Sequence, residues 1–194
     1  MRDIAKNEML FILSIFKNPE REYNASTAAR AIGISPMGAL KIARRLEKEG
    51  IVLSRQLGKA RFYQLNLENN YTREYVKFLL KRESEQAPSY VKVWINEAKK
   101  IKNADVAILF GSILKKEKEA NDIDVLLVTD QKRFSRLKKE LEDINLINVK
   151  KLHPVYQSGE DVKNNIKKGD KALLNAIKGI VVFGEDALIG VMKK

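Results

Sequence analysis

Three segments near the start of the chain carry apolar residues at helical spacing. The first spans residues 7–17, the second spans 25–32 and ends at Gly33, and the third begins at Ser35-Pro36 and runs to residue 50. Glycine favours a left-handed helix end, and serine followed by proline is a strong helix start. The pattern therefore predicts three successive helices. The apolar face of the third helix consists of Ala39, Ile42, Ala43 and Leu46.

Residues 51–66 replace the helical spacing with a strand-like alternation on both sides of Leu57-Gly58-Lys59. This pattern predicts a β-hairpin with basic residues at and beside its tip. Helical spacing returns in residues 70–83, whose apolar face contains Tyr75 and Leu79. That helix either builds a dimer seam or covers the core of the first domain, and the pattern alone favours neither.

The second half of the chain alternates between helical and strand-like segments. It contains a helix at 89–102, an apolar strand at 104–110, a second apolar strand from 122, a helix at 131–146, a third strand at 146–157, and a closing helix, short strand and terminal helix at 170–192. A mixture of this kind predicts a sheet flanked by helices.

A polar segment at 83–89 interrupts the pattern and is the best boundary between the halves. We therefore predict an α/β (α+β) chain with a first domain at 1–68, a linking helix and linker at 69–88, and a second domain at 89–194. At 194 residues, the chain is long enough for two small cores.

Positive charge is concentrated in one part of the first half. The chain has a formal net charge of +12, which favours a polyanionic partner. Residues 30–61 carry eight Lys or Arg and only two acidic residues, so the basic block coincides with the third helix and the hairpin. Either this block binds duplex DNA, which we favour, or its charges only solvate a domain that docks another protein.

Three helices followed by a basic hairpin resemble the winged helix-turn-helix domain of ArsR- and MarR-type regulators. The resemblance implies that the third helix enters the major groove, while the hairpin meets phosphates or the minor groove. The residues expected to reach base edges are Met37, Gly38, Lys41 and Arg44 or Arg45. Those expected to contact the DNA backbone are Arg55, Lys59 and Arg61.

Candidate chemistry lies in residues 107–128, AILFGSILKKEKEANDIDVLLV. Gly111-Ser112 ends one apolar run, nine residues follow, and Asp122 and Asp124 open the next run. Two residues apart on a strand, these carboxylates leave the same face and repel each other unless a cation lies between them. Gly111 would let a phosphate approach the backbone, and Ser112 can donate hydrogen bonds to it. A simple turn with a strand-edge carboxylate would leave the Gly-Ser unexplained.

This arrangement resembles the signature of the polymerase-beta-like nucleotidyltransferase superfamily in its minimal form, and the resemblance continues to the C-terminus. It implies a mixed sheet flanked by helices, with Mg²⁺ and a nucleoside triphosphate (NTP) as cofactors. Asp122 and Asp124 would be the catalytic residues and metal ligands, and Gly111, Ser112 and Lys115 would bind the nucleotide.

The sequence departs from that family on the third strand. Active members place a third carboxylate there as general base, whereas LINVKKLHPV contains no Asp or Glu. Lys150 or Lys151 lies about where the acid is expected, and a protonated amine would oppose a metal and could not act as a base. We interpret the neighbouring His153 as a packed or surface residue. Whether the domain is an active enzyme stays open on the sequence.

Composition excludes several classes of site. The chain has no cysteine, which excludes disulfides and thiolate metal sites, and its single histidine excludes a His-based zinc site. The apolar stretch MLFILSIF is too short to cross a bilayer and lacks the features of a signal peptide. We therefore expect a cytoplasmic protein with no membrane partner.

Together these patterns predict a DNA-binding transcriptional regulator whose nucleotidyltransferase-fold domain binds Mg-NTP. The alternative is an active Mg-dependent nucleotidyltransferase that modifies a protein or small molecule, including a minimal-nucleotidyltransferase antitoxin with a toxin partner. A homodimer is the candidate assembly in the first case.

Overall fold

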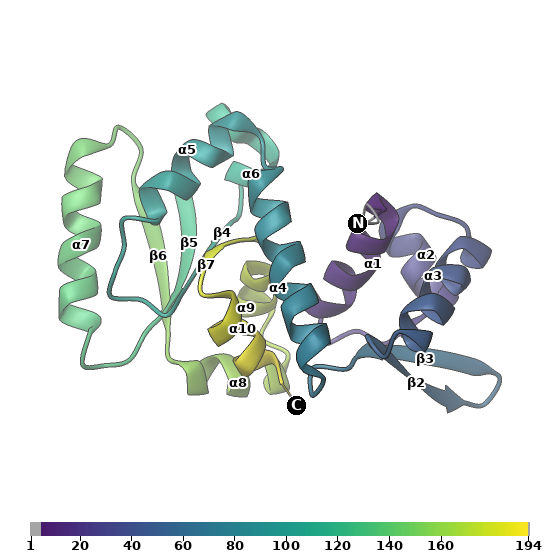
Figure 1. The fold of residues 1–194 in the computed structure, drawn as a ribbon. Coiled ribbons are helices and arrows are strands. Elements are labelled where there is room, and N and C mark those ends of the chain that lie inside the picture. The colour runs from purple at the N-terminus through teal and green to yellow at the C-terminus, as the bar shows by residue number, and fades with distance from the viewer. Residues whose placement is uncertain (1–4, 194) are drawn as a thin grey trace. The chain divides into compact units, whose positions relative to one another are not determined.

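The computed structural model describes residues 5–193, which divide into two compact units (Figure 1). The first unit comprises residues 5–79 with Lys193, and the second is Leu80–Met192. The division falls within one helix, α4 (Asn70–Glu85), so this helix continues into the polar segment where the sequence pattern breaks. No helix in the described part of the chain has the length and apolar character needed to cross a membrane.

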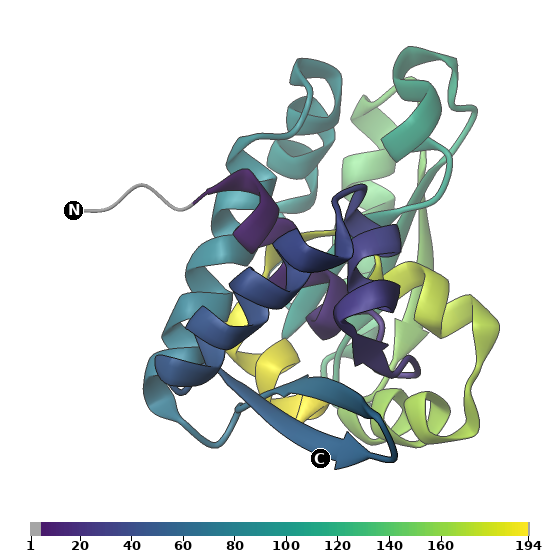
Figure 2. The ribbon, with the colours of Figure 1, turned by 90° about the vertical axis from the view of Figure 1, so that its right-hand side faces the viewer.

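The first unit is a winged helix-turn-helix. Its elements are α1 (Lys6–Lys17), β1 (Tyr23–Asn24), α2 (Ala25–Ile32), α3 (Pro36–Lys48), β2 (Val52–Leu57) and β3 (Ala60–Leu65). The strands form one antiparallel sheet in the order β1-β3-β2. The three predicted helices and the hairpin are confirmed, and Figure 2 shows α3 beside the β2–β3 hairpin. The two-residue strand β1 was not predicted because it is too short for alternation to show.

Local side-chain chemistry sets the ends of α2 and α3, and the caps at Gly33 and Ser35-Pro36 are those that the sequence predicts. Asn24 and Thr27 form a reciprocal capping box at the start of α2. Gly33 ends that helix in the left-handed conformation, with φ of 73°. Ser35 Oγ then accepts a hydrogen bond of 3.1 Å from the Gly38 N–H, and Pro36 occupies the first turn of α3. These caps fix the tight turn between the two helices.

A buried acid ties three helices of the first unit together. Glu8 in α1 lies almost fully buried and forms an ion pair with Arg45 in α3. The Tyr75 hydroxyl, in α4, donates a hydrogen bond of 2.7 Å to the same carboxylate. The Thr72 hydroxyl adds a contact of 3.4 Å to the Gly50 carbonyl. The first turns of α4 therefore cover the core of this unit, and a dimer seam stays a prediction.

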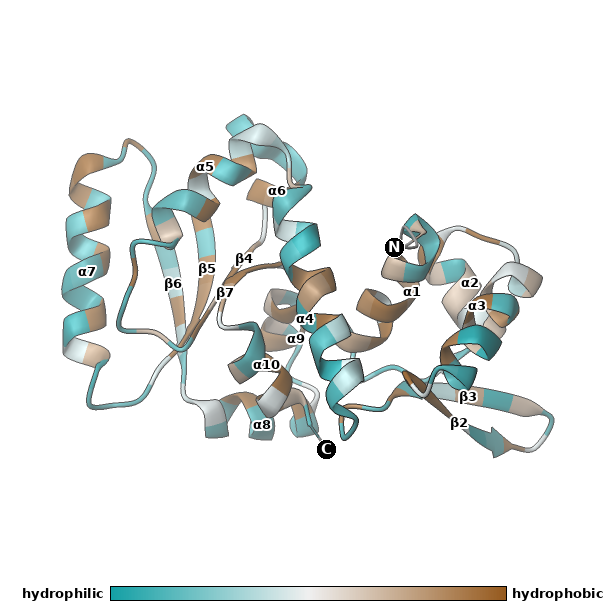
Figure 3. Ribbon diagram, viewed as in Figure 1, coloured by the Kyte–Doolittle hydropathy of each residue, from teal (hydrophilic) through white to brown (hydrophobic). Residues whose placement is uncertain are grey.

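The second unit is a four-stranded mixed sheet with helices. Its elements after α4 are α5 (Ser89–Ala98), β4 (Val106–Phe110), α6 (Ile113–Lys116), the 3₁₀ turn η1 (Glu117–Glu119), β5 (Ile123–Val128), α7 (Phe134–Ile147), β6 (Leu152–Gln157), α8 (Gly159–Lys168), α9 (Lys171–Ile177), β7 (Ile180–Phe183) and α10 (Glu185–Met192). The strand order is β6-β5-β4-β7, in which only β5 and β6 run parallel. The central strands β4 and β5 are predominantly apolar (Figure 3).

One side of this sheet packs against α5 and α7. The shared core includes Trp94 from α5, Leu141 from α7 and Val125 from β5. Among the described residues, α9 and α10 contribute nothing to this core although they contact β4, so they cover the other side. Because side chains alternate along β5 and both Ile123 and Val125 belong to this core, Asp124 faces away from it.

The structure corrects the predicted third strand. Helix α7 continues to Ile147, and the strand begins at Leu152, where the Ile123–Leu152 pairing fixes its register. The apolar residues that suggested an earlier start, Leu146, Ile147 and Val149, are exposed. Helix α8 was not predicted, because Val162 is its only fully buried residue. Its one strong signal is the capping box between Ser158 and Asp161.

We predict that Arg45→Met lowers the free energy of unfolding by about 2 kcal/mol, because the buried Glu8 carboxylate loses its cation. The matched control is Arg44→Met, since Arg44 is the exposed neighbour and has no ion pair within residues 5–193. That control should stay within about 0.5 kcal/mol of the wild type. Urea unfolding followed by circular dichroism measures both, and equal losses would contradict the structural role of Arg45.

Candidate functional site

The register of β4 and β5 brings the Gly-Ser and the two aspartates together. Phe110, the last residue of β4, pairs with Asp124 in the antiparallel ladder. Gly111 follows directly and Ser112 opens α6, so the chain leaves β4 beside the start of β5. Asp124 is the second residue of β5, and Asp122 stands directly before that strand, close enough for its charge to act on Asp124.

Gly111 makes room for the Asp124 carboxylate. Its φ is +78°, and a Cβ added there would lie 2.0 Å from Asp124 Oδ2. No side chain fits at that distance, so this glycine is required both by its backbone conformation and by the carboxylate above it. The other predicted nucleotide contacts are less constrained: Ser112 makes no side-chain cap to α6, and Lys115 is exposed.

His153 is the residue at this site that the sequence interpretation missed. It pairs with Asp124 across the parallel β5–β6 ladder, so the two side chains emerge on the same face. Its Nε2 lies 3.7 Å from Asp122 Oδ1. The exposed imidazole thus borders the carboxylate pair. Only the pairing register could have shown this, because the start of β6 decides which side chain stands beside Asp124.

The electrostatics of the pair are those of a site that favours a cation. Burial raises the pKa of the Asp124 carboxyl above its usual value, the charge of Asp122 adds to the rise, and His153 opposes it. Among the residues described, neither aspartate forms an ion pair with Lys or Arg. A bound cation would relieve both the burial and the repulsion.

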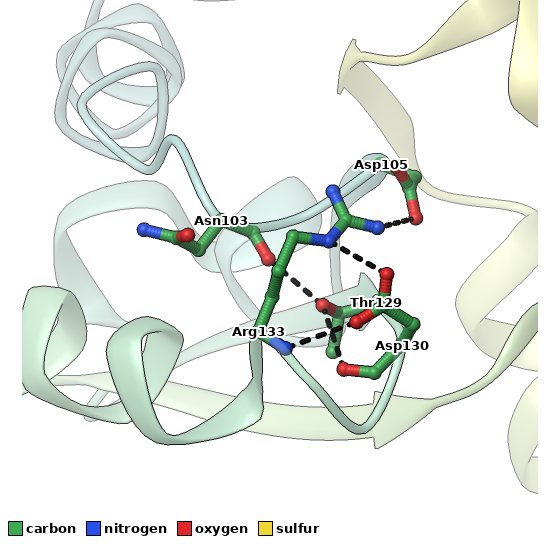
Figure 4. Close-up of polar contacts among 5 residues, drawn as sticks. All are labelled: Asn103, Asp105, Thr129, Asp130 and Arg133. Atoms are coloured by element: carbon green, nitrogen blue, oxygen red, sulfur yellow. Dashed lines mark hydrogen bonds and ion pairs between the residues drawn. The ribbon is translucent and has the colours of Figure 1, made fainter.

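A second pair of acids, at the opposite end of the same strands, shares one arginine as its cationic partner (Figure 4). Arg133 forms an ion pair with Asp105, before β4, and with Asp130, after β5, at 2.9 Å in the second case. Hydrogen bonds from Arg133, its backbone N–H first, lower the pKa of Asp130. The Thr129 hydroxyl donates to the Asn103 carbonyl at 2.8 Å and closes this end. One acidic end of the sheet therefore has an arginine as its partner, whereas the aspartates at the other end have no Lys or Arg partner among the described residues.

The end with Asp122 and Asp124 fits a hydrated divalent cation that carries a nucleotide. In residues 5–193, no three His, Asp or Glu side chains are grouped so as to hold a metal ion without other ligands. Two neighbouring carboxylates are nevertheless a sufficient protein contribution for Mg²⁺, which commonly takes its remaining ligands from water and substrate phosphates. Asp122 and Asp124 would hold the ion, and its charge would stabilise the triphosphate.

The expectation that Lys150 or Lys151 replaces a third carboxylate is wrong. Both residues precede β6, and both ammonium groups are directed to main-chain carbonyls: Lys150 contacts those of Lys118 and Ala120, and Lys151 contacts those of Asn145 and Asn148. Among the described residues, neither lysine forms an ion pair with Asp122 or Asp124. Strand β6 still carries no acidic residue.

In the winged helix, the structure divides the predicted DNA contacts into two groups. Arg45 pairs with Glu8, Arg55 with Glu22 at 2.9 Å, and Arg61 with Glu47 at 3.2 Å. Lys41, Arg44 and Lys59 are exposed and have no ion pair within the described residues. Met37 is also exposed at the start of α3, with Gly38 beside it in the same turn. The face available for phosphates is therefore smaller than the count of basic residues suggests.

We predict that Gly111→Ala destabilises the second unit far more than Gly169→Ala. Both glycines have a positive φ near 70–80°, but an added Cβ at Gly169 would meet nothing within 4 Å. The control should cost about 1–2 kcal/mol for its conformation alone, whereas Gly111→Ala also displaces the Asp124 carboxylate. Thermal unfolding measures both, and combining Gly111→Ala with Asp124→Ala should recover part of the loss. Equal melting temperatures for the two single variants would contradict the close approach.

Solved structures of low similarity share about half of this chain. A mutant of ZitR from Lactococcus lactis has a TM-score of 0.37 at 11% identity, covering 52% of this chain and 64% of its own, just under two thirds. The adhesin competence repressor AdcR from Streptococcus pyogenes has a TM-score of 0.36 at 13% identity, covering 52% and 69%. Sso10a-2, a DNA-binding protein from Sulfolobus solfataricus, has a TM-score of 0.33 at 18% identity, covering 49% and 96%. TM-scores this low do not establish a shared fold. The winged-helix assignment therefore rests on the element order and the sheet of the chain itself.

The family comparison falls on the second unit. No curated protein matches the chain. Residues 93–186 match the family described as polymerase beta, nucleotidyltransferase, and this range contains β4, β5, β6 and the whole carboxylate site. The chain thus carries a nucleotidyltransferase domain of the polymerase beta family at residues 93–186, preceded by a winged helix-turn-helix.

Proposed function

We propose that this protein is a DNA-binding regulator whose nucleotidyltransferase domain binds a complex of a divalent cation and a nucleoside triphosphate. The observation that carries the nucleotide half is the pair of Asp122 and Asp124, which has no Lys or Arg partner among the described residues, on a sheet whose other two acids share Arg133. The DNA half is supported by the exposed basic residues of α3 and the hairpin.

The proposed DNA interface is the exposed side of α3 together with the hairpin tip. Lys41 and Arg44 are three residues apart in α3 and therefore lie on one face. Lys59 stands at the turn between β2 and β3. Helix α3 enters the major groove, and Lys59 contacts the phosphate backbone beside it. Arg55 and Arg61 hold the hairpin against the body of the domain through their ion pairs with Glu22 and Glu47.

We predict that the wild type binds a fluorescent random-sequence duplex, with an affinity that falls steeply as salt rises. Arg44→Ala and Lys41→Ala should each weaken binding and reduce the slope of log affinity against log salt by about one, because on a random sequence each cation acts mainly through its charge on the nearby phosphates. Lys81→Ala removes an exposed lysine in α4 and is the matched control. Fluorescence anisotropy measures all four proteins. If Arg44→Ala and Lys81→Ala bind like the wild type, this face is not the DNA interface.

The proposed nucleotide site is formed by Asp122 and Asp124, with Gly111, Ser112 and Lys115 beside them. The carboxylates hold the cation, and the triphosphate completes its ligands. Lys115, exposed on α6, contributes positive charge for the phosphates. His153 borders the site where an acceptor would approach.

We predict that the wild type binds a non-hydrolysable NTP analogue in the presence of Mg²⁺ or Mn²⁺, and that EDTA abolishes this binding. Asp122→Asn and Asp124→Asn should each weaken it by at least about tenfold, because each removes a metal ligand. Asp143→Asn, which changes an exposed acid on α7, is the control. Isothermal titration with the analogues of ATP, GTP, CTP and UTP gives the affinities. Absence of binding by the folded wild type would contradict the nucleotide half of the proposal.

Transfer of the nucleotide is the second candidate function, favoured by the intact carboxylate pair and weakened by a β6 without an acid. Incubation with alpha-labelled NTPs and host lysate decides between binding and transfer. Label that the wild type transfers and Asp124→Asn does not would establish an enzyme.

A further inference from the structure

The segment between α6 and β5 holds an unfavourable backbone conformation. Glu117 has φ of 46°, and it is the only residue other than glycine with a positive φ among residues 5–193. With ψ of −113°, this conformation lies outside the left-handed helical region, costs a side-chain-bearing residue about 1–3 kcal/mol, and persists only where its surroundings impose it. The segment leads directly into Asp122, so whatever imposes its shape also places that carboxylate.

The Lys150 side chain spans this segment. Its ammonium donates to the Ala120 carbonyl at 2.6 Å and to the Lys118 carbonyl, and it lies 5.4 Å from the centre of the Tyr90 ring. Next to it, the Lys151 carbonyl accepts a hydrogen bond of 3.1 Å from the Ile123 N–H. The approach to β5 is therefore held by two kinds of contact: the Lys151 backbone, directly before β6, bonds Ile123, and the Lys150 side chain bonds the carbonyls of Lys118 and Ala120.

Lys151 shows that these contacts are specific to Lys150. Its ammonium donates to the Asn145 and Asn148 carbonyls, the second at 2.9 Å, and so caps the C-terminal end of α7. Two adjacent lysines thus have the same chemistry and different targets. Only the first reaches the segment that carries Asp122.

We propose that Lys150 is a positioning residue for the metal–nucleotide site, because its ammonium holds the 117–121 segment in the shape that presents Asp122 to the cation. This inference rests on the proposed nucleotide binding and adds a residue to which no role in it had been given. Without Lys150, the carbonyls of Lys118 and Ala120 lose their donor and the Glu117 backbone is free to relax. Asp122 would then sample positions away from Asp124, and the cation would bind more weakly without loss of the fold.

Hydrogen exchange of the free protein tests the clamp. Lys150→Met should speed amide exchange in residues 117–123 by about tenfold, the effect of losing one or two hydrogen bonds. Lys151→Met should leave this segment unchanged and affect the end of α7 instead. Lys150→Arg, which keeps a cationic donor, should restore slow exchange. Equal exchange in Lys150→Met and the wild type, or the same increase in Lys151→Met, would overturn the proposal.

Titration with the Mn²⁺–NTP analogue complex tests the consequence for binding. Lys150→Met should weaken binding by about tenfold, as loss of a group that orients a metal ligand typically does, while Lys151→Met should bind like the wild type. Rescue by Lys150→Arg separates positioning from general destabilisation. If Lys150→Met speeds exchange in residues 117–123 but binds the Mn²⁺–NTP analogue complex with wild-type affinity, the proposed role of Lys150 in the nucleotide site is overturned. If the wild type binds no nucleotide, the proposed function fails, and the exchange data still decide whether Lys150 holds the segment.

Discussion

The placement of the Asp124 carboxylate over Gly111 is the constraint on which the second unit depends. The antiparallel pairing of β4 and β5 fixes this approach, because Phe110 stands opposite Asp124 and the next residue has to turn away without a side chain. The carboxylate is thereby held half-buried, near Asp122 and without a lysine or arginine partner among the described residues. A fold selected for stability alone would neutralise or remove such a charge, so its retention favours a function.

Both ends of the β4–β5 pair carry two aspartates, but the partners of these aspartates differ between the two ends. Arg133 compensates Asp105 and Asp130 with direct contacts, and that end is closed by hydrogen bonds. At the other end, Lys150 and Lys151 direct their ammonium groups to backbone carbonyls, and the exposed His153 imidazole borders Asp122. Positive charge is abundant in this chain, yet within residues 5–193 no lysine or arginine forms an ion pair with this carboxylate pair, which leaves space for an external cation.

Charge pairing also shapes the winged helix. Three of the arginines that appear available in the sequence are held by glutamates within the fold: Arg45 by Glu8, Arg55 by Glu22 and Arg61 by Glu47. The buried pair joins α1 to α3. Of the two exposed pairs, Arg55–Glu22 joins the hairpin to the residue directly before β1, and Arg61–Glu47 joins it to α3. The unit thus uses part of its positive charge to fix the hairpin and presents the remainder on α3 and at the tip. DNA phosphates would compete with Glu22 and Glu47 for the two arginines of the exposed pairs, because solvent already weakens those ion pairs.

The sequence by itself determined the elements whose causes are local. The caps at Gly33 and Ser35-Pro36, the apolar stripe of α3 and the two aspartates at the approach to β5 are all legible from spacing, and so was the fold class of both units. Tertiary structure decided what depends on partners distant in the chain. The Ile123–Leu152 register placed the start of β6 and put His153 beside Asp124, while long-range contacts engaged Arg45 with Glu8 and Lys150 with the Ala120 carbonyl. Spacing reveals which face a side chain occupies, but only the folded chain shows which groups meet it there.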